Sequence, residues 1–408
     1  MACWLNSKNV KYMLTGKTIV LGVTGGIAAY KSANLASMLI KLHADVHVIM
    51  TQNATKFITP MTFETLTNNK CIVDTFDRNF SFDVKHVSLA KRGDLFIVAP
   101  CTANVIGKLA HGICDDMLTT TMLATRAPKL IAPAMNTGMW ENPILQDNLT
   151  KLKGYGYHII DPIIGRLACG DTGTGKMQAE EVIVEHILSF MAKEKDLAGK
   201  RYLITAGPTQ EAIDPVRYIT NHSSGKMGYA IAKMARLRGA QVTLVSGPVN
   251  IKPFCGVDVV PVKSAADMFE AVTSRSAEAD VVIMCSAVAD YTPAVYADQK
   301  VKKHDGDLQI ELKRTQDILG WLGEHKPANQ TLVGFSMETE NLIENSRAKL
   351  LKKHAQLICA NSIAGGNTGF AVDTNKVTLI SNQEVKELPL CSKEETADLI
   401  IDHIQTLV

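Results

Sequence analysis

Two stretches of the sequence decide the fold: GKTIVLGVTGG, residues 16–26, and GKRYLITAGPT, residues 199–209. Each consists of a Gly-Lys pair, a run rich in Ile, Val, Leu or Tyr, and a turn that contains glycine. In parallel sheets a first strand is connected to the following helix in this way. The chain is therefore predicted to begin an α/β domain twice.

Short apolar runs recur along both halves of the chain. They lie at residues 46–50, 95–98, 130–132, 158–160, 241–245, 281–285, 331–335, 357–360 and 377–380. Stretches of helical length separate them, which is the alternation of a doubly wound sheet. We predict two doubly wound, Rossmann-like α/β domains with parallel sheets. The charged stretch MAKEKDLAGK marks the boundary, so the domains are placed at residues 16–190 and 191–408.

The composition is that of an ordinary folded protein. With 408 residues, of which 46% are apolar and 21% charged, the chain has room for two or three domains. The formal charge of +2 provides no chain-wide field for nucleic acid or an acidic membrane. The nine cysteines form no C-x-x-C pair, and no 18-residue apolar run occurs. These features favour a cytoplasmic protein without a disulfide framework, a zinc site or a membrane span.

The glycine-rich segments do not match the standard nucleotide motifs. Adjacent Gly25 and Gly26 would let backbone amides approach an anion at a helix N-terminus. A dinucleotide fingerprint requires another glycine spacing and an acid closing the second strand, where residues 50–52 are Met, Thr and Gln. GDTGTGKM, residues 170–177, resembles a Walker motif but has Met177 where the magnesium-binding hydroxyl belongs. We predict a flexible loop there with no nucleotide role.

Several polar residues follow predicted strands, where α/β sheets bind ligands. Asn136 stands in the segment PAMNTGMW, and Thr102 and Asn104 follow the strand that ends near residue 98. His86 precedes a helical stretch, and Cys169 lies beside Gly170. Taken one at a time, such an Asn is as often structural as functional, whereas a lone His or Cys is more often structural.

Taken together, these segments resemble the flavin-binding cysteine decarboxylase family. The Gly-Gly turn, the single His, the P-A-M-N-x-x-M segment and the loop Cys before a Gly-rich turn occur in family order over residues 17–190. The resemblance implies that FMN is bound by Gly25, Gly26, Thr102 and Asn104. It further implies catalytic roles for Cys169, His86 and Asn136, and substrate binding by Asn136 and Met139.

The second half resembles phosphopantothenate–cysteine ligase. The matching segments are LITAGPTQEAIDPVRYITNHSSGKMG at 203–228, SAVADYTP at 286–293, KVKK at 300–303, LVGFSMETE at 332–340 and LICANSI at 357–363. The order, decarboxylase before ligase, is that of bacterial bifunctional coenzyme A biosynthesis proteins. The resemblance implies that Asn221 orients an acyl nucleotide for attack, and that CTP is contacted by Asp290, Lys300, Thr315, Gln316, Asp317, Ile318, Phe335, Lys349 and Lys353.

The resemblance implies two consecutive reactions. The ligase half would activate 4'-phosphopantothenate with CTP, Mg²⁺ neutralising the triphosphate, and the amine of L-cysteine would displace CMP. The metal ligands stay unassigned. The decarboxylase half would use FMN to oxidise the cysteine C–S unit to a thioaldehyde, so that CO2 can leave. His86 would help to initiate this step, and Cys169 would protonate the enethiol as the reduced flavin returns hydride.

Two departures from the family pattern and one rival remain. Cys101 stands where a small residue is usual, and Lys176 stands where Arg is common, which keeps the charge but loses the bidentate fork. Some relatives are flavin-binding regulatory proteins that inhibit a phosphatase, and this is the alternative function. The family also implies a homo-oligomer, with trimeric flavin domains grouped into a dodecamer and dimeric ligase domains. No nucleic acid or membrane partner is expected.

Overall fold

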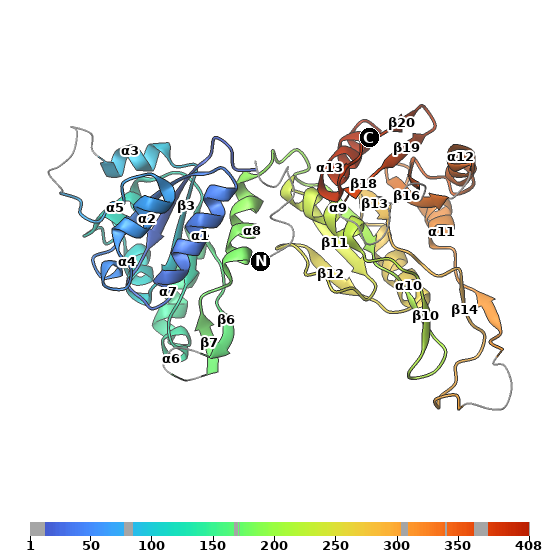
Figure 1. Ribbon diagram of the computed structural model, residues 1–408, viewed down its shortest axis with the longest axis horizontal. Coiled ribbons are helices and arrows are strands. Elements are labelled where there is room, and N and C mark those ends of the chain that lie inside the picture. Colours follow the sequence, from blue (N-terminus) through green and yellow to red (C-terminus); the bar gives the residue numbers. More distant parts are fainter. Residues whose placement is uncertain are drawn as a thin grey trace. The chain divides into compact units, whose positions relative to one another are not determined.

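The computed structural model describes residues 13–76, 85–166, 170, 172–302, 309–338, 341–362 and 374–407. The chain divides into two compact units, with the break between Lys193 and Glu194 (Figure 1). Each unit has its own main sheet and its own hydrophobic core. The two units are therefore described separately.

The N-terminal unit is built on a five-stranded sheet whose neighbouring strands are all parallel. The strand order is β2-β1-β3-β4-β5, the flavodoxin-like order, in which the winding reverses between β1 and β3. Both β1 and β3 are buried along their whole length, as expected for strands covered on both faces. The strands are β1 (Thr18–Val23), β2 (Asp45–Met50), β3 (Leu95–Cys101), β4 (Lys129–Pro133) and β5 (Tyr157–Ile159).

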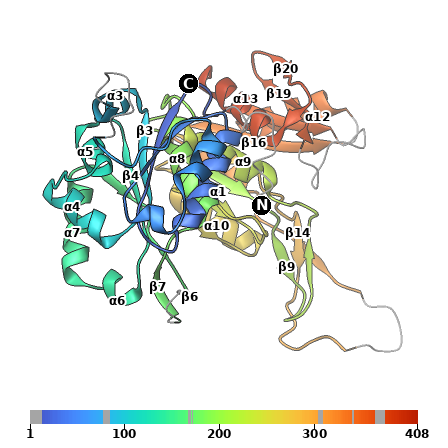
Figure 2. The same ribbon diagram turned by 60° about the vertical axis from the view of Figure 1, so that its left-hand side comes forward.

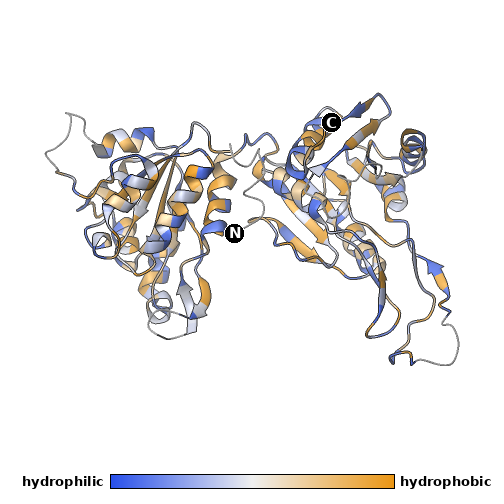
Figure 3. Cartoon of the chain, in the orientation of Figure 1, coloured by the Kyte–Doolittle hydropathy of each residue, from blue (hydrophilic) through white to orange (hydrophobic). Residues whose placement is uncertain are grey.

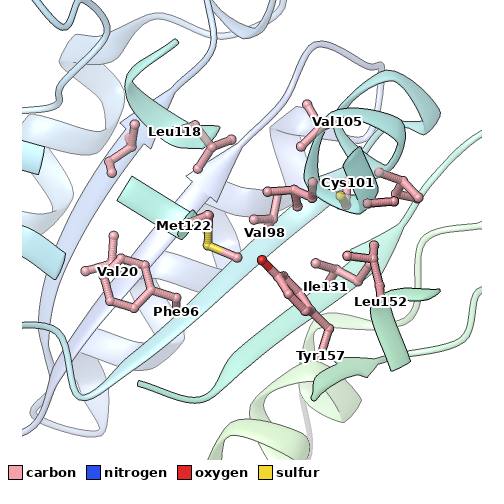
Figure 4. Packing of buried hydrophobic residues seen from close by; sticks show 14 of the residues in the cluster. Val20, Phe96, Val98, Cys101, Val105, Leu118, Met122, Ile131, Leu152 and Tyr157 are labelled. Carbon is pink, nitrogen blue, oxygen red and sulfur yellow. The ribbon is translucent and has the colours of Figure 1, made fainter. Parts of the chain in front are cut away.

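Helices cover both faces of this sheet (Figure 1). On one face α1 (Ala29–Lys41) packs against α8 (Glu180–Met191). On the other face α4 (Ala103–His111), α5 (Met117–Ala124) and α7 (Pro143–Gly154) enclose a core that includes Phe96, Ile131 and Tyr157 (Figure 4). The shorter elements of the unit are η3 (Ala54–Lys56), α2 (Pro60–Thr67), α3 (Lys85–Arg92), α6 (Thr137–Trp140) and the antiparallel pair β6 (Ile163–Arg166) and β7 (Thr172–Lys176).

The C-terminal unit contains an eight-stranded sheet in the order β12-β11-β8-β13-β16-β17-β19-β20. The first six positions are parallel and, counted along the chain, have the Rossmann order 3-2-1-4-5-6, with the reversal between β8 and β13. At the end of the sheet, β19 pairs antiparallel with β17, and β20 pairs antiparallel with β19. The strands are β8 (Arg201–Ala206), β11 (Gln241–Ser246), β12 (Asp258–Pro261), β13 (Val281–Met284), β16 (Thr331–Glu338), β17 (Leu357–Ser362), β19 (Val377–Ser381) and β20 (Val385–Glu387).

Five helices among the described residues cover this second sheet. On one face α9 (Lys226–Leu237) packs against α13 (Lys393–Gln405), and on the other α10 (Ala265–Ser276), α11 (Ile318–His325) and α12 (Leu342–Lys352) share one apolar core. Apolar residues concentrate in the strands, whereas the helices are two-sided (Figure 3). Figure 2 shows β9 and β14 side by side, away from the main sheet. The small antiparallel pairs are β9 (Gln210–Ala212) with β10 (Tyr218–Thr220), β14 (Tyr291–Pro293) with β15 (Leu312–Arg314), and β18 (Thr374–Asn375) with β21 (Cys391–Ser392).

The prediction of two doubly wound α/β domains is confirmed, and each predicted apolar run overlaps a strand. Two expectations were wrong. The run 377–380 forms antiparallel β19, so the second sheet is mixed instead of wholly parallel. The segment 170–177 is not a flexible loop where it is described, because residues 172–176 form β7 and Met177 is buried. Among the described residues no helix is long and apolar enough to span a lipid bilayer.

Candidate active sites

The N-terminal unit has a cavity of about 1070 Å³ at the carboxyl ends of β1, β3 and β4. This is the edge at which doubly wound sheets bind ligands, next to the reversal between β1 and β3. The cavity brings together residues that are far apart in the sequence. Of the predicted site residues, those that line it are Gly25, Gly26, Thr102, Asn104, Asn136 and Met139.

Of the two glycines in the turn after β1, Gly25 is required by close packing and Gly26 is not. A Cβ on Gly25 would lie 2.5 Å from the Cβ of Asn53 and 2.8 Å from its backbone carbonyl carbon. A Cβ on Gly26 would meet only Thr102, at the ordinary distance of 3.7 Å. The turn continues into α1, whose N-cap residue Ala28 makes no side-chain capping bond. The turn and the uncapped helix N-terminus suit an anionic group such as a flavin phosphate.

Asn136 is held by the helix that it begins. Its Oδ1 accepts a hydrogen bond from the backbone N–H of Met139 at 2.8 Å, which caps the short helix α6. The Nδ2 group has no hydrogen-bond partner within the described residues, and the side chain is exposed at the cavity. Since an amide N–H donates, Asn136 can present a fixed donor to a carboxylate.

The β6–β7 pair closes one side of this cavity through contacts that only glycine permits. The N–H of Met135 donates to the carbonyl of Gly175 at 3.0 Å. A Cβ on Gly175, whose φ is +144°, would lie 2.4 Å from the Met135 carbonyl oxygen, and one on Gly173 would lie 2.3 Å from Thr137 Oγ1. The glycines that resemble a phosphate loop thus let β7 pack closely on residues 135–137.

Cations also line the N-terminal cavity. Arg166 and Lys176 come from the β6–β7 pair, and Lys108 comes from α4. The sequence pattern did not single out Arg166 or Lys108. Lys108 Nζ donates to Asp115 at 2.6 Å and Asp116 at 3.3 Å, and the bond to Asp115 is the main cause that raises the pKa of Lys108. The cavity can therefore accept a ligand that carries negative groups.

The predicted catalytic residues His86 and Cys169 are not among the described residues that line this cavity. His86 lies in α3, is half-buried and does not line the cavity. Cys169 lies outside the described residues. The departure at Cys101 is a core feature, because this side chain is fully buried under α4 and α5, and burial raises the pKa of its thiol far above the usual value.

The C-terminal unit has a second cavity, of about 470 Å³, near the carboxyl ends of β13 and β16 and the bases of β14 and β15. Lys300 and Asn221 are the predicted residues of this half that do not line it. The sequence pattern missed Ser286 and Arg314, which do. The predicted residues that line it are Asp290, Thr315, Gln316, Asp317, Ile318, Phe335, Lys349 and Lys353.

Hydrogen bonds fix the charged groups of this second cavity. Lys349 Nζ donates to the Phe335 carbonyl at 2.9 Å, and Lys353 Nζ forms an ion pair with Asp317. Asp317 also caps α11 by accepting from the N–H of Gly320 at 2.9 Å. Burial would raise the pKa of Asp317, but the hydrogen bond from Lys353 and the cap outweigh it, so that pKa is lowered. The cavity thus offers two anchored ammonium groups to a polyanion.

Lys300 and Asn221 lie next to residues with fixed positions. The fully buried carboxylate of Asp214 accepts from the N–H of Val301 at 3.2 Å and pairs with Arg217, whose hydrogen bond holds the pKa of Asp214 well below its usual range. Asn221 Nδ2 donates to the carbonyl of Ala287 at 3.0 Å. Within the described residues no group of three or more His, Cys, Asp or Glu is arranged to hold a metal ion.

Comparison with known proteins agrees with both halves of this description. The Flavoprotein family model matches residues 7–192, and the model for the DNA/pantothenate metabolism flavoprotein C-terminal domain matches residues 197–407. The chain is 47% identical over 399 residues to the coenzyme A biosynthesis bifunctional protein CoaBC of Bacillus subtilis (strain 168), covering 97% of this chain and 98% of that protein.

A further relative and a solved structure are also similar to this chain. A cysteine/cysteine sulfinic acid decarboxylase from an unknown prokaryotic organism is 45% identical over 357 residues, covering 86% of this chain and 99% of that protein. The crystal structure of the C-terminal domain of a coenzyme A biosynthesis bifunctional protein CoaBC is 48% identical and covers 52% of this chain and 96% of that chain, with a TM-score of 0.45.

The fold, the cavities and the two family models define a two-domain protein in which a flavoprotein domain precedes a pantothenate-metabolism domain. The chain belongs to the family of bifunctional coenzyme A biosynthesis proteins. As a member of it, the chain is an enzyme that combines a decarboxylase with a ligase, and this confirms the resemblance drawn from the sequence. The regulatory alternative needs only a flavin domain, so the match over both domains favours the enzyme.

Proposed function

We propose that the C-terminal half joins 4'-phosphopantothenate to L-cysteine at the expense of CTP, and that the N-terminal half decarboxylates the product with FMN. The observation that carries this proposal is the second cavity. Eight of the nine residues expected to contact CTP line it together, although they come from four separate segments of the chain. Such convergence is what a binding site requires and what surface residues would not produce.

The ligase residues have complementary tasks in this proposal. A carboxylate is a poor electrophile at neutral pH, so it is activated as an acyl-cytidylate with loss of pyrophosphate. Lys349 and Lys353 neutralise the phosphates, while Ile318 and Phe335 supply apolar wall for the base. The carboxylates that line this cavity are Asp290 and Asp317. This suits Mg²⁺ held mainly by triphosphate oxygens and water, with one or two carboxylates.

The N-terminal cavity fits a flavin because the Gly25–Gly26 turn and the uncapped N-terminus of α1 lie together at it and suit an anionic phosphate group. When bound, FMN supplies the oxidising centre that makes loss of CO2 possible. In this proposal Gly25 and Gly26 bind the flavin with Thr102 and Asn104, and Asn136 donates Nδ2–H to the substrate carboxylate. Met139 contacts the substrate, and Cys169 donates the final proton.

The position of His86 bears on the predicted oligomer. His86 does not line the cavity of its own chain. We propose that it acts in the cavity of a neighbouring copy, which a trimer of flavin domains would allow. Neither His86→Asn nor Cys169→Ser chains should form the final reduced product alone, and mixing them should restore its formation in part, because some sites would combine two intact residues. Mixed oligomers that form no reduced product would reject this assignment.

The test of the function uses the full chain with flavin bound. Incubation with 4'-phosphopantothenate, L-cysteine and CTP should release pyrophosphate and then CO2, and Cys169→Ser should release CO2 yet accumulate the oxidised product. Without CTP-dependent pyrophosphate release the ligase proposal fails.

The relative described as a cysteine decarboxylase favours a second candidate function, in which the N-terminal half takes free cysteine as its substrate. CO2 release from cysteine alone, without CTP, would support that candidate. The cytoplasm stays the predicted location.

A further inference from the structure

A buried threonine links two strand ends in the N-terminal unit. Thr24 follows β1 directly and is fully buried. Its hydroxyl donates to the carbonyl of Pro100 at 2.7 Å and accepts from the N–H of Thr102 at 3.1 Å. The regular pairing of β1 with β3 ends at Gly22 and Val98, so this hydroxyl connects the two segments beyond the ladder.

A threonine in the C-terminal unit makes the same kind of link. Thr205, near the end of β8, is also fully buried. Its Oγ1 accepts from the N–H of Cys285 at 3.0 Å and of Ser286 at 3.1 Å, and it donates to Ser286 Oγ at 2.8 Å. The pairing of β8 with β13 ends at Thr205 and Met284, so the hydroxyl again binds the chain just beyond the last paired residue of the neighbouring strand.

The two links occupy corresponding places in two different topologies. Strands β1 and β3 are the pair at which the first sheet reverses, and strands β8 and β13 are the pair at which the second sheet reverses. At such a reversal the connections leave in opposite directions, which opens the crevice where ligands bind. The segments that follow the two strands separate at this point, so an additional hydrogen bond is needed to fix their positions.

Each link fixes a residue that lines a cavity. Thr102 lines the N-terminal cavity, called here the flavin cavity after the proposed ligand, and is the N-cap residue of α4, where its own side chain makes no capping bond. Ser286 lines the cavity of the C-terminal unit, called here the nucleotide cavity after the proposed ligand. The next residue, Ala287, accepts the hydrogen bond from Asn221. Since a displaced wall residue weakens ligand contacts, each threonine acts on its ligand through a neighbour.

We propose that Thr24 and Thr205 are equivalent positioning residues, each of which holds the strand ends beside its unit's ligand cavity through its hydroxyl. Thr24 is thereby a positioning residue for the flavin, and Thr205 for the nucleotide. Neither was indicated by the sequence pattern, because a threonine in or after a buried strand is ordinary. The Thr205 part rests on the proposed CTP-dependent ligation, whereas the Thr24 part needs only flavin binding.

The experiment compares valine and serine at each position in the full chain. Valine keeps the branched shape and removes the hydroxyl, which leaves the partly buried N–H groups of the neighbouring segment without their acceptor. Serine keeps the hydroxyl and removes a methyl group. Thr24→Val should raise the dissociation constant for FMN about tenfold, and Thr205→Val should raise the KM for CTP in pyrophosphate release about tenfold or more, because two N–H groups lose their acceptor.

Each variant has its control in the other half of the same chain. Thr24→Val should leave the KM for CTP within about twofold of the unaltered chain, and Thr205→Val should leave the FMN dissociation constant within about twofold. Thr24→Ser and Thr205→Ser should each stay within about threefold, since the hydroxyl bonds are retained.

Several outcomes would overturn the proposal. One is that the valine variants bind their ligand as the unaltered chain does, and another is that the serine variants are as impaired as the valine ones. A third is that calorimetry shows the unit to be unfolded at the assay temperature, which would explain the loss of ligand binding. An unaltered chain that binds FMN but releases no pyrophosphate would reject the proposed ligation instead, and the Thr24 variants would then decide the inference.

Discussion

The glycine turn after β1 gives the most stringent test of the flavin cavity. In Gly25→Ala the new Cβ would lie 2.5 Å from the Cβ of Asn53 and 3.0 Å from its carbonyl oxygen. Carbon atoms prefer a separation of about 3.5–4.0 Å, so the two segments must move apart by roughly 1 Å. Overpacking of this kind costs about 1–3 kcal/mol of unfolding free energy.

The expected size can be measured by calorimetry on protein freed of flavin. For a unit that ends at Lys193, each kcal/mol lowers the melting temperature by about 2–4 °C, so Gly25→Ala should lower it by about 2–12 °C. Because Asn53 also lines the cavity, the same variant should bind FMN less tightly. The transition of the C-terminal unit should not move, since the units have separate cores.

Gly26→Ala is the matched control for this prediction. Its Cβ would meet Thr102 Cγ2 at 3.7 Å, an ordinary contact, so the flavin-free unit should keep its stability within about 1 kcal/mol. Equal destabilisation by the two substitutions, or a Gly25→Ala unit that melts like the unaltered one, would refute the steric reasoning.

Three further predictions concern other parts of the chain. Gly175→Ala would place a Cβ 2.4 Å from the Met135 carbonyl oxygen, so β7 should separate from residues 135–137 and CO2 release should fall at least about tenfold, with pyrophosphate release unchanged. Lys349→Met removes an ammonium group from the nucleotide cavity, so the KM for CTP should rise roughly tenfold or more in a pyrophosphate-release assay. Burial lowers the pKa of His403, so below pH ~6.5 the unfolded chain binds the proton more readily than the folded chain does. Denaturant titrations should therefore show the C-terminal unit losing stability as the pH falls. His403→Gln should flatten this dependence on pH.

The chain offers a control for each of these predictions. A Cβ on Gly165, in the same hairpin, would meet the flexible side chain of Lys176, with Cδ at 3.3 Å and Nζ at 3.9 Å, so Gly165→Ala should retain CO2 release. Lys352 is exposed and does not line the nucleotide cavity, and Lys352→Met should leave the KM for CTP unchanged. A pH dependence that persists in His403→Gln would assign it to other groups.

The central strands could be predicted because burial on both faces leaves a continuous apolar run in the sequence. The β6–β7 pair could not be predicted in this way. Its second strand is TGTGK, and alternating glycines lower the expectation of a strand, whereas here they are required for close packing on Met135 and Thr137. Short strands such as β9 and β14 leave no periodic pattern at all.

The sites were predicted unevenly, and the reasons are physical. Many of the residues selected by segment resemblance line one of the two cavities where they follow strand ends, since topology brings those ends together. Arg314 was missed because it stands among other charged residues, with no local signal of the cavity it faces. His86 was expected to take part in catalysis and does not line the cavity of its own chain, and in the proposal above it acts in the cavity of a neighbouring copy.

The strand order of the second sheet also has a consequence for synthesis of the chain. β8 is made first and lies inside the sheet, and each later strand joins an edge that already exists, outward to β12 on one side and to β20 on the other. Until β19 is made, the apolar β17 is an open edge, which can pair with other chains. The final strand β20, VKE, carries a lysine and a glutamate that discourage further pairing. A chain cut short before β19 should therefore aggregate, although the nucleotide cavity would already have been synthesised.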